Sequence, residues 1–356
     1  MSVRWFSRLF TFLILGLASF PVWAQNVTIT PLGAAQGEFC AGDRALLFED
    51  PTGVRVLIAP GRTVNGSGDG RLPDPAGETG GVHVLLIDHP HVDHIGDVFH
   101  TNCQGNANSA FAFPSEGNAP EIAAVHKSAV LVGGELPDFF NQKISNVSPS
   151  FAALSGTQKS CPAAGLDNTV LVPSTARTVD NACVGVIRGG TRTATMQGAS
   201  KGVKITTIPA FHAAGASRMH VDAPNVPPGL TGYAGHETGY IMRFTNGLSV
   251  LWTGDSGLIG DWATQAKFYG VNLAVVHGGD LFTMGPDEAA FAVNELIKPR
   301  SVIPEHFNQV STSGGKVNPG TRLARFIQQL KGQASTRVIV PLSGTAISCD
   351  GQGNCK

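Results

Sequence analysis

A cluster of four side chains that commonly bind metals places the strongest constraint on how this chain can fold. His89, His91, Asp93 and His94 lie within six residues, directly after the apolar, β-branched run 82–87. Such a run is typical of a buried strand, so the cluster is expected on a loop at the strand's C-terminal end. A polar surface loop is the alternative, but three of the chain's 11 histidines lie in this hexapeptide. We favour metal binding, because imidazole and carboxylate groups are the usual ligands of zinc and related metals.

Three further candidate ligands each lie just past a predicted strand, and these are His212, Asp255 and His306. Taken singly, each is more often an ordinary loop residue, but their shared placement favours a joint site. Residues two apart on extended backbone point the same way. His89 and His91 can therefore bind one ion, while Asp93 and His94 turn toward a second.

The remaining chain alternates between strand and helix patterns. Strands are predicted at 27–30, 45–49, 54–59, 82–87, 203–209, 240–245, 249–253, 273–276, 302–304 and 337–342, and helices at 121–131, 136–144, 286–296 and 320–330. Asn246-Gly247 predicts a hairpin. Residues of about 145–200 are rich in Gly, Ser, Thr and Pro and are interpreted as an irregular insertion. Two sheets packed face to face with helices outside fit this order.

The order His-x-His-x-Asp-His, then His, then Gly-Asp, then His resembles that of the metallo-β-lactamase superfamily. Segments 202–212 and 280–306 are similar to those of bacterial metal-dependent hydrolases related to ascorbate-phosphate lactonase. The match covers 45–308 apart from 145–200. The resemblance implies an α/β (α+β) protein with a four-layer αββα sandwich and a site at one edge of the two sheets.

The resemblance also implies a ligand set for two divalent ions. The first ion would be held by His89, His91 and His212, the second by Asp93, His94 and His306, with Asp255 bridging both. Zinc is favoured, and manganese or iron would also fit. Two ions about 3.5–4 Å apart would turn a bridging water into hydroxide at neutral pH, with Asp93 as one candidate catalytic residue.

Some positions depart from the family pattern. Ala59 stands where relatives usually have an aspartate that supports a ligand, and Asp88 stands where Ser or Thr is usual and can compensate. His277 occupies a position that is often proline. Asp255 stands where many antibiotic-hydrolysing members carry cysteine or serine, which argues against a typical β-lactamase.

Secondary candidates surround this set. His236 precedes the predicted hairpin that leads to Asp255. It is a candidate catalytic residue that contacts substrate or protonates the leaving group, and an ordinary surface-loop histidine is the alternative. Asp97 is a candidate to orient a ligand histidine. His220 and Asp222 are weaker candidates to line the pocket.

Residues 1–24 have the three-part pattern of a signal peptide, with a basic start, the apolar run 9–20 and Ala24 before Gln25. A membrane anchor is the alternative, but the run is short of the roughly 20 residues that span a bilayer. We therefore expect one hydrolase domain over 25–356, periplasmic or secreted, with no membrane span after cleavage.

All six cysteines lie in the mature part. An even number in an exported chain favours disulfides over free thiols. Cys349 with Cys355 is the favoured pair, because a short flexible loop joins them. Cys161 with Cys183 is the next choice.

The formal net charge of −1 and the 14% of charged residues give no basis for a nucleic-acid partner. The predicted function is an exported binuclear metal-dependent hydrolase that acts on a small molecule. A metal-bridging hydroxide would attack an ester, lactone or phosphoester bond. The alternatives are an exported metal-binding protein without catalysis and, among enzymes, a β-lactam or phosphodiester hydrolase.

Overall fold

The computed structural model describes residues 25–77, 80–113, 116–147, 150, 161, 163–172, 182–213, 215–217, 231–330 and 336–356. The predicted signal peptide, His220 and Asp222 lie outside these ranges. Two large β-sheets contain most of the described strands, and they consist of seven and eight strands.

The first sheet has the strand order β21-β1-β2-β3-β4-β7-β9. Its strands are β1 (Val27–Pro31), β2 (Leu46–Glu49), β3 (Arg55–Ile58), β4 (Val84–Ile87), β7 (Ala129–Val132), β9 (Cys183–Val186) and β21 (Ile347–Cys349). Strand β4 pairs in parallel with β3 and β7, and all of its residues are buried. Burial on both faces explains why its sequence is an unbroken apolar run.

The second sheet has the order β20-β17-β16-β15-β14-β11-β10-β8. Its strands are β8 (Thr169–Val172), β10 (Thr191–Met196), β11 (Val203–Pro209), β14 (Thr238–Arg243), β15 (Ser249–Trp252), β16 (Leu273–His277), β17 (Ser301–Glu305) and β20 (Arg337–Val338). The predicted hairpin is confirmed: β14 and β15 pair antiparallel, and Gly247 in their turn has a φ of 102°. Strands β15, β16 and β17 are parallel, so their C-terminal ends lie at one edge.

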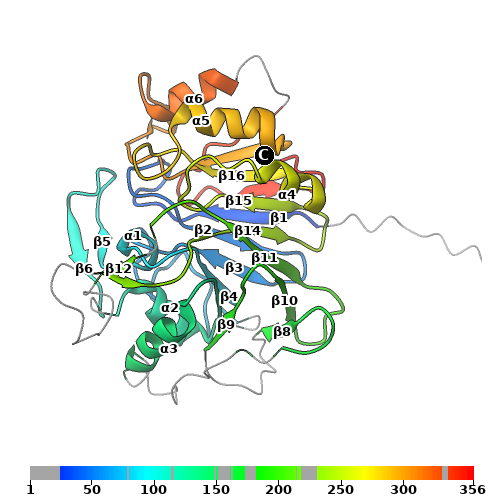
Figure 1. Cartoon of the computed structure of the whole chain (residues 1–356). Coiled ribbons are helices and arrows are strands. Elements are labelled where there is room, and N and C mark those ends of the chain that lie inside the picture. The colour runs from blue at the N-terminus through cyan, green and yellow to red at the C-terminus, as the bar shows by residue number, and fades with distance from the viewer. Residues whose placement is uncertain are drawn as a thin grey trace, which may run out of the picture.

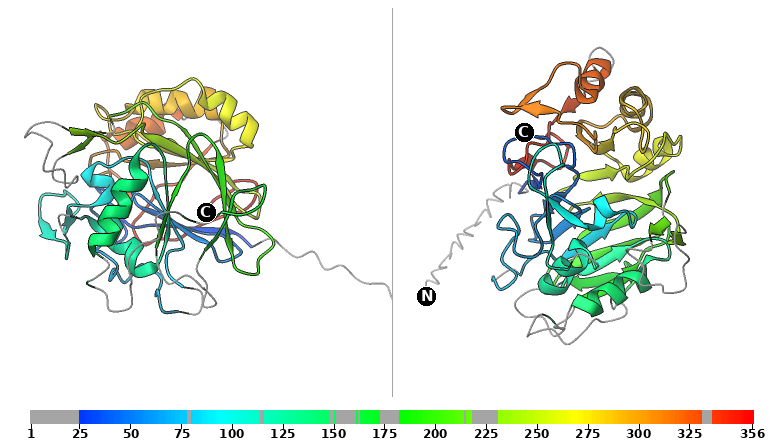
Figure 2. Two further views of the ribbon diagram at one scale, coloured as in Figure 1. Left: turned by 60° about the horizontal axis from the view of Figure 1, so that its bottom comes forward. Right: turned by 90° about the vertical axis from the view of Figure 1, so that its left-hand side faces the viewer.

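Helices cover the outer faces of both sheets, as Figures 1 and 2 show. On the first sheet lie α2 (Asn118–His126) and α3 (Leu136–Val147); on the second lie α4 (Trp262–Tyr269), α5 (Pro286–Phe291), its continuation η2 (Ala292–Ile297) and α6 (Arg322–Leu330). Alternate strand residues separate into different apolar clusters. Phe48 packs between the sheets, whereas its neighbour Leu47 faces the helices, as strand geometry requires. The predicted αββα sandwich is thus confirmed.

Shorter elements complete the described fold. They are α1 (Val92–Ile95) and three two-stranded sheets formed by β5 (Val98–His100) with β6 (Asn108–Ala110), β12 (Gly215–Ser217) with β13 (Thr231–Tyr233), and β18 (Thr312–Ser313) with β19 (Lys316–Val317). Helix α1 lies within the histidine cluster itself.

Two sequence-based predictions were wrong. The helix predicted at 121–131 ends at His126, because Lys127 adopts a left-handed conformation with φ 55°. Ala129–Val132 is instead the buried strand β7. The stretch 145–200 is also not an irregular insertion in its described part. It supplies β8, β9 and β10 to the two main sheets, since short strands completed by pairing with distant segments leave little local periodicity.

Three disulfides link the six cysteines, as Cys40–Cys103, Cys161–Cys183 and Cys349–Cys355. Both pairs favoured by the sequence are confirmed. Within the ranges given above, no helix combines the length and apolar character needed to cross a bilayer.

Candidate metal centre

The seven candidate ligands all lie beyond the C-terminal ends of strands and meet at one edge of the sandwich. The loop after β4 and helix α1 carry four of them, and His212, Asp255 and His306 follow β11, β15 and β17. Strand β11 runs in the same direction as β15, since both pair antiparallel with β14. The sheet therefore delivers all three to the same edge. Residues from the loop after β4, from α1 and from the ends of the second sheet's strands line one open pocket, here called the metal pocket.

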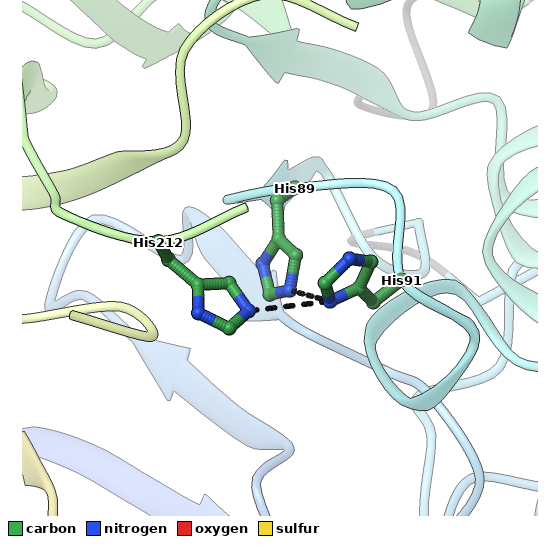
Figure 3. A group of neighbouring side chains, drawn as sticks. All are labelled: His89, His91 and His212. Atoms are coloured by element: carbon green, nitrogen blue, oxygen red, sulfur yellow. Dashed lines mark hydrogen bonds between the residues drawn. The ribbon is translucent and has the colours of Figure 1, made fainter. Parts of the chain in front are cut away.

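His89, His91 and His212 form the first group, here called the histidine triad. Nδ1 of His91 lies 2.9 Å from Nε2 of His89 and 3.3 Å from Nε2 of His212. Figure 3 shows the three rings pointing toward one another from two separate segments. Three imidazole nitrogens around one point cannot all donate and accept among themselves, so a shared cation satisfies their lone pairs better.

Asp93, His94, Asp255 and His306 form the second group, here called the acidic set. Nε2 of His306 lies 3.1 Å from Oδ2 of Asp255 and 3.4 Å from Oδ2 of Asp93. Nε2 of His94 lies 3.4 Å from the same Asp255 oxygen. The Nε2 atoms of His94 and His306 are buried and have no hydrogen-bond partner among the described residues. Such unsatisfied nitrogens beside two carboxylates fit a cation.

Burial and neighbouring charges tune the two groups differently. Desolvation and the nearby His89 and His212 lower the pKa of His91 to about 3. The triad nitrogens are therefore neutral and ready to bind a cation at neutral pH. Burial alone would lower the pKa of His94, but the carboxylates of Asp88 and Asp255 outweigh it and raise that pKa to about 9. In the metal-free protein His94 thus carries a proton at neutral pH.

Two buried side chains contact candidate ligands on the side that faces away from the site. Oδ1 of Asp88 lies 2.8 Å from Nδ1 of His94 and accepts a hydrogen bond from the backbone N–H of His89. Nδ1 of His277 lies 2.8 Å from Oδ1 of Asp255. These partners orient ligand atoms toward the centre of the site. Asp88 therefore supports His94, as its sequence position suggested, whereas Ala59 has no polar side chain that could support a ligand.

Arg44 is the participant that sequence reasoning missed. Its guanidinium, with the side chain only 4% exposed, forms an ion pair with Oδ2 of Asp93. The loop that carries it is fixed by Asp43, whose carboxylate accepts hydrogen bonds from the backbone N–H groups of Cys40 and Ala34. No local pattern around Arg44 signals this role, because the two partners are 49 residues apart and meet only in the fold.

Other candidates lie away from the centre. His236 is exposed, is absent from the lining of the metal pocket, and lines a separate cleft with Tyr233. The structure therefore does not place it near the reacting position. Asp97 pairs through both oxygens with Arg62, at 2.6 and 2.7 Å, rather than with a histidine.

The chain is similar in sequence and in fold to several known proteins. The profile of the beta-lactamase superfamily domain matches residues 171–307. A UPF0173 metal-dependent hydrolase of Cupriavidus taiwanensis is 27% identical over 309 residues, which are 86% of this chain and 84% of that protein. Another from Cupriavidus necator is 35% identical over 140 residues, so the chain spans 46% of that relative. A solved metallo hydrolase from Ignicoccus hospitalis has 18% identity and a TM-score of 0.49, over 90% of this chain and 98% of that one.

The αββα sandwich and the site are of the metallo-β-lactamase type, and the chain is similar in sequence to the beta-lactamase superfamily domain over residues 171–307. Over most of its length it is also similar to a metal-dependent hydrolase that carries the name UPF0173.

Proposed function

We propose that this chain is an exported binuclear hydrolase that cleaves an ester, lactone or phosphoester bond of a small molecule. The observation that carries the proposal is the position of one atom, Oδ2 of Asp255. It lies 3.1 Å from Nε2 of His306, 3.4 Å from that of His94, 3.8 Å from that of His212 and 3.9 Å from that of His89. A carboxylate oxygen between both groups suits a bridge between two cations.

The residues divide naturally between two ions. The histidine triad would hold the first, and the acidic set would hold the second, with Asp255 shared. When bound, two divalent ions would supply a nucleophilic hydroxide at neutral pH and polarise the bond that is broken. Zinc suits this histidine-rich, thiolate-free set best, and manganese or iron also fit.

Side chains of the protein orient two of the candidate ligands and provide one exposed carboxylate. Asp88 fixes the ring of His94, and His277 fixes the carboxylate of Asp255. Asp93 is the most exposed member of the acidic set, at 25% against 3% or less for the others. Its carboxylate therefore reaches the pocket and is the candidate to take a proton from water or to hold it in place. His236 has no part in this proposal, because it lies outside the pocket.

The open pocket and the number of candidate ligands favour catalysis over metal storage. The ligands border an open pocket that a substrate can enter. A purely structural zinc site instead has four protein ligands and no open coordination position. By resemblance to the lactonase branch, a lactone or other carboxylic ester is the first choice of substrate. A phosphoester comes next.

Export is supported by the cysteines. Three disulfides persist in oxidising compartments and are rare in reducing ones. Together with the leader pattern of residues 1–24, they favour a periplasmic or secreted enzyme.

The test is metal analysis of the mature protein combined with a screen of ester, lactone, β-lactam and phosphodiester substrates. We expect two metals per chain and turnover of at least one ester or lactone. His236→Ala is the matched control, since it removes a histidine outside the pocket and should keep both metals and the full rate. Fewer than one metal per chain would exclude the proposed site. Tight metal binding without turnover of any substrate would favour the non-catalytic alternative.

A further inference from the structure

Large apolar side chains gather at the mouth of the metal pocket. Phe211, Leu281 and Phe282 are 78%, 86% and 59% exposed. Leu281 and Phe282 line the pocket that also contains His91 and Asp255, and all three border a smaller cleft that adjoins it at His212. We name these three residues the apolar wall. Exposed large apolar side chains that adjoin one another mark a surface that binds something apolar.

A constrained turn presents two of these side chains. Asp280 and Leu281 have φ values of 62° and 65°, a left-handed region that a branched residue such as leucine rarely adopts. The turn is closed by hydrogen bonds from the backbone N–H of Asp280 to the carbonyl of Met284, at 3.1 Å, and from that of Phe282 to the carbonyl of Asp280, at 2.7 Å. Strained backbone of this kind persists where the surroundings impose it, often beside functional sites.

Ser256 ties the apolar wall to the metal centre. This buried residue directly follows the candidate bridging ligand Asp255. Its hydroxyl accepts a hydrogen bond from the backbone N–H of Phe211 at 2.9 Å. Its carbonyl accepts one from the backbone N–H of Met284, also at 2.9 Å. Both segments of the wall are therefore held at a fixed position relative to Asp255.

The lining of the metal pocket is mixed, since Arg62, Gln104 and Asn308 line it together with Leu281 and Phe282. A substrate that has both an apolar and a polar part therefore finds matching side chains in this pocket.

We propose that the apolar wall binds the aliphatic acyl chain of a carboxylic ester substrate and so determines specificity. This inference rests on the proposed ester hydrolysis. The acyl chain is the proposed occupant because the wall adjoins the metal ligands: Leu281 and Phe282 border both the metal pocket and the adjoining cleft. When the carbonyl carbon of an ester lies at the metal ligands, the acyl chain attached to it can reach this wall. Each methylene of the acyl chain that is buried against the wall should raise the binding affinity or kcat/KM about fourfold.

Calorimetry on the metal-loaded mature protein tests the inference without turnover. The probes are linear alkanoates from acetate to octanoate, which match the acyl product. We expect affinity to rise about two- to fourfold per methylene. In the double variant Leu281→Ser, Phe282→Ser the rise should largely vanish, while acetate binding changes less than threefold. Equal affinity along the series, or the same slope in the variant, would overturn the inference.

Turnover of 4-nitrophenyl esters of the same chain lengths gives the second measurement. Activity that is independent of chain length would contradict the apolar wall while leaving the proposed hydrolase intact. The absence of turnover with every ester, lactone and phosphoester would contradict the proposed hydrolase and with it the ester substrate. The calorimetric slope tests separately whether the apolar wall binds an alkyl chain. Phe268→Ser is the matched control, since Phe268 is 78% exposed on α4 and does not line the metal pocket. It should preserve the slope.

Discussion

The histidine triad and the acidic set lie side by side but differ in charge and in protonation. The triad consists of three imidazoles whose pKa values are all lowered by burial. The acidic set combines two carboxylates with His306 and with His94, whose pKa is raised to about 9, and the buried Arg44 forms an ion pair with its Asp93. One group is neutral and prepared for a cation, while the other must release a proton and accommodate the charge of Arg44. We therefore expect the triad to fill first.

Asp255 is the ligand that the proposed function shares between the two ions, and its loss should have the largest effect. In Asp255→Ala we expect loss of at least one of the two ions and a fall in rate of at least about a thousandfold, since two ions lose their shared ligand. Metal analysis by mass spectrometry and steady-state kinetics measure both. A variant that keeps two metals and the full rate would show that Asp255 does not bridge.

Matched substitutions separate the two groups. His91→Ala removes a triad ligand and His306→Ala removes a ligand of the acidic set. We expect each to lower the rate by about a hundredfold or more, by loss of one catalytic ion. The order of filling predicts a difference: His306→Ala should retain one tightly bound metal, whereas His91→Ala should lose the tighter of the two. Titration with a metal indicator checks this, and identical losses in the two variants would remove the distinction.

Proton release gives a test of the same comparison in the unaltered protein. A ligand histidine must be neutral, so binding to the acidic set has to displace the proton of His94. Because its pKa of about 9 lies above neutral pH, the affinity of the second ion should rise up to about tenfold per pH unit between pH 7 and 9. The first ion should show no such dependence, since the pKa of His91 is about 3. Calorimetry in buffers of different ionisation enthalpy counts the protons released at each step.

Arg44 gives the smallest predicted effect and the only gain. In Arg44→Met we expect the second ion to bind more tightly, on the order of tenfold, because a positive charge beside Asp93 is removed. The affinity of the first ion should stay unchanged. Thermal unfolding of the metal-free variant serves as the control for folding. Weaker binding of the second ion would mean that Arg44 orients Asp93 more than it repels the metal.

Much of this arrangement was predictable because it is local. The β4 run ends directly in the histidine cluster, so sequence alone indicates both the strand and the ligands that follow it. Apolar runs before His212, Asp255 and His306 carry the same information. The hairpin at Asn246-Gly247 is predictable from its turn residues, since few residues tolerate positive φ.

The unpredicted parts depend on contacts between distant segments. Ala129–Val132 continues a helical pattern in sequence, and only its pairing with β4 makes it a strand. Strands β8 to β10 are likewise specified by the sheets that receive them. Arg44 reaches Asp93 through tertiary folding alone. His236 shows the converse, since its proximity to the hairpin in sequence does not place it in the pocket.

The Cys40–Cys103 disulfide makes the assembly of the pocket depend on where the chain folds. It closes a loop over a sequence separation of 63, a constraint of about 4 kcal/mol in the chain-entropy treatment. Beside it, the backbone N–H of Ala41 bonds to the carbonyl of Cys103, and Ala41, Gly42 and Gln104 line the metal pocket. In a reducing compartment this rim would lack its covalent tie. Under the proposed export, the rim of the pocket would therefore become cross-linked only where the chain meets an oxidising environment.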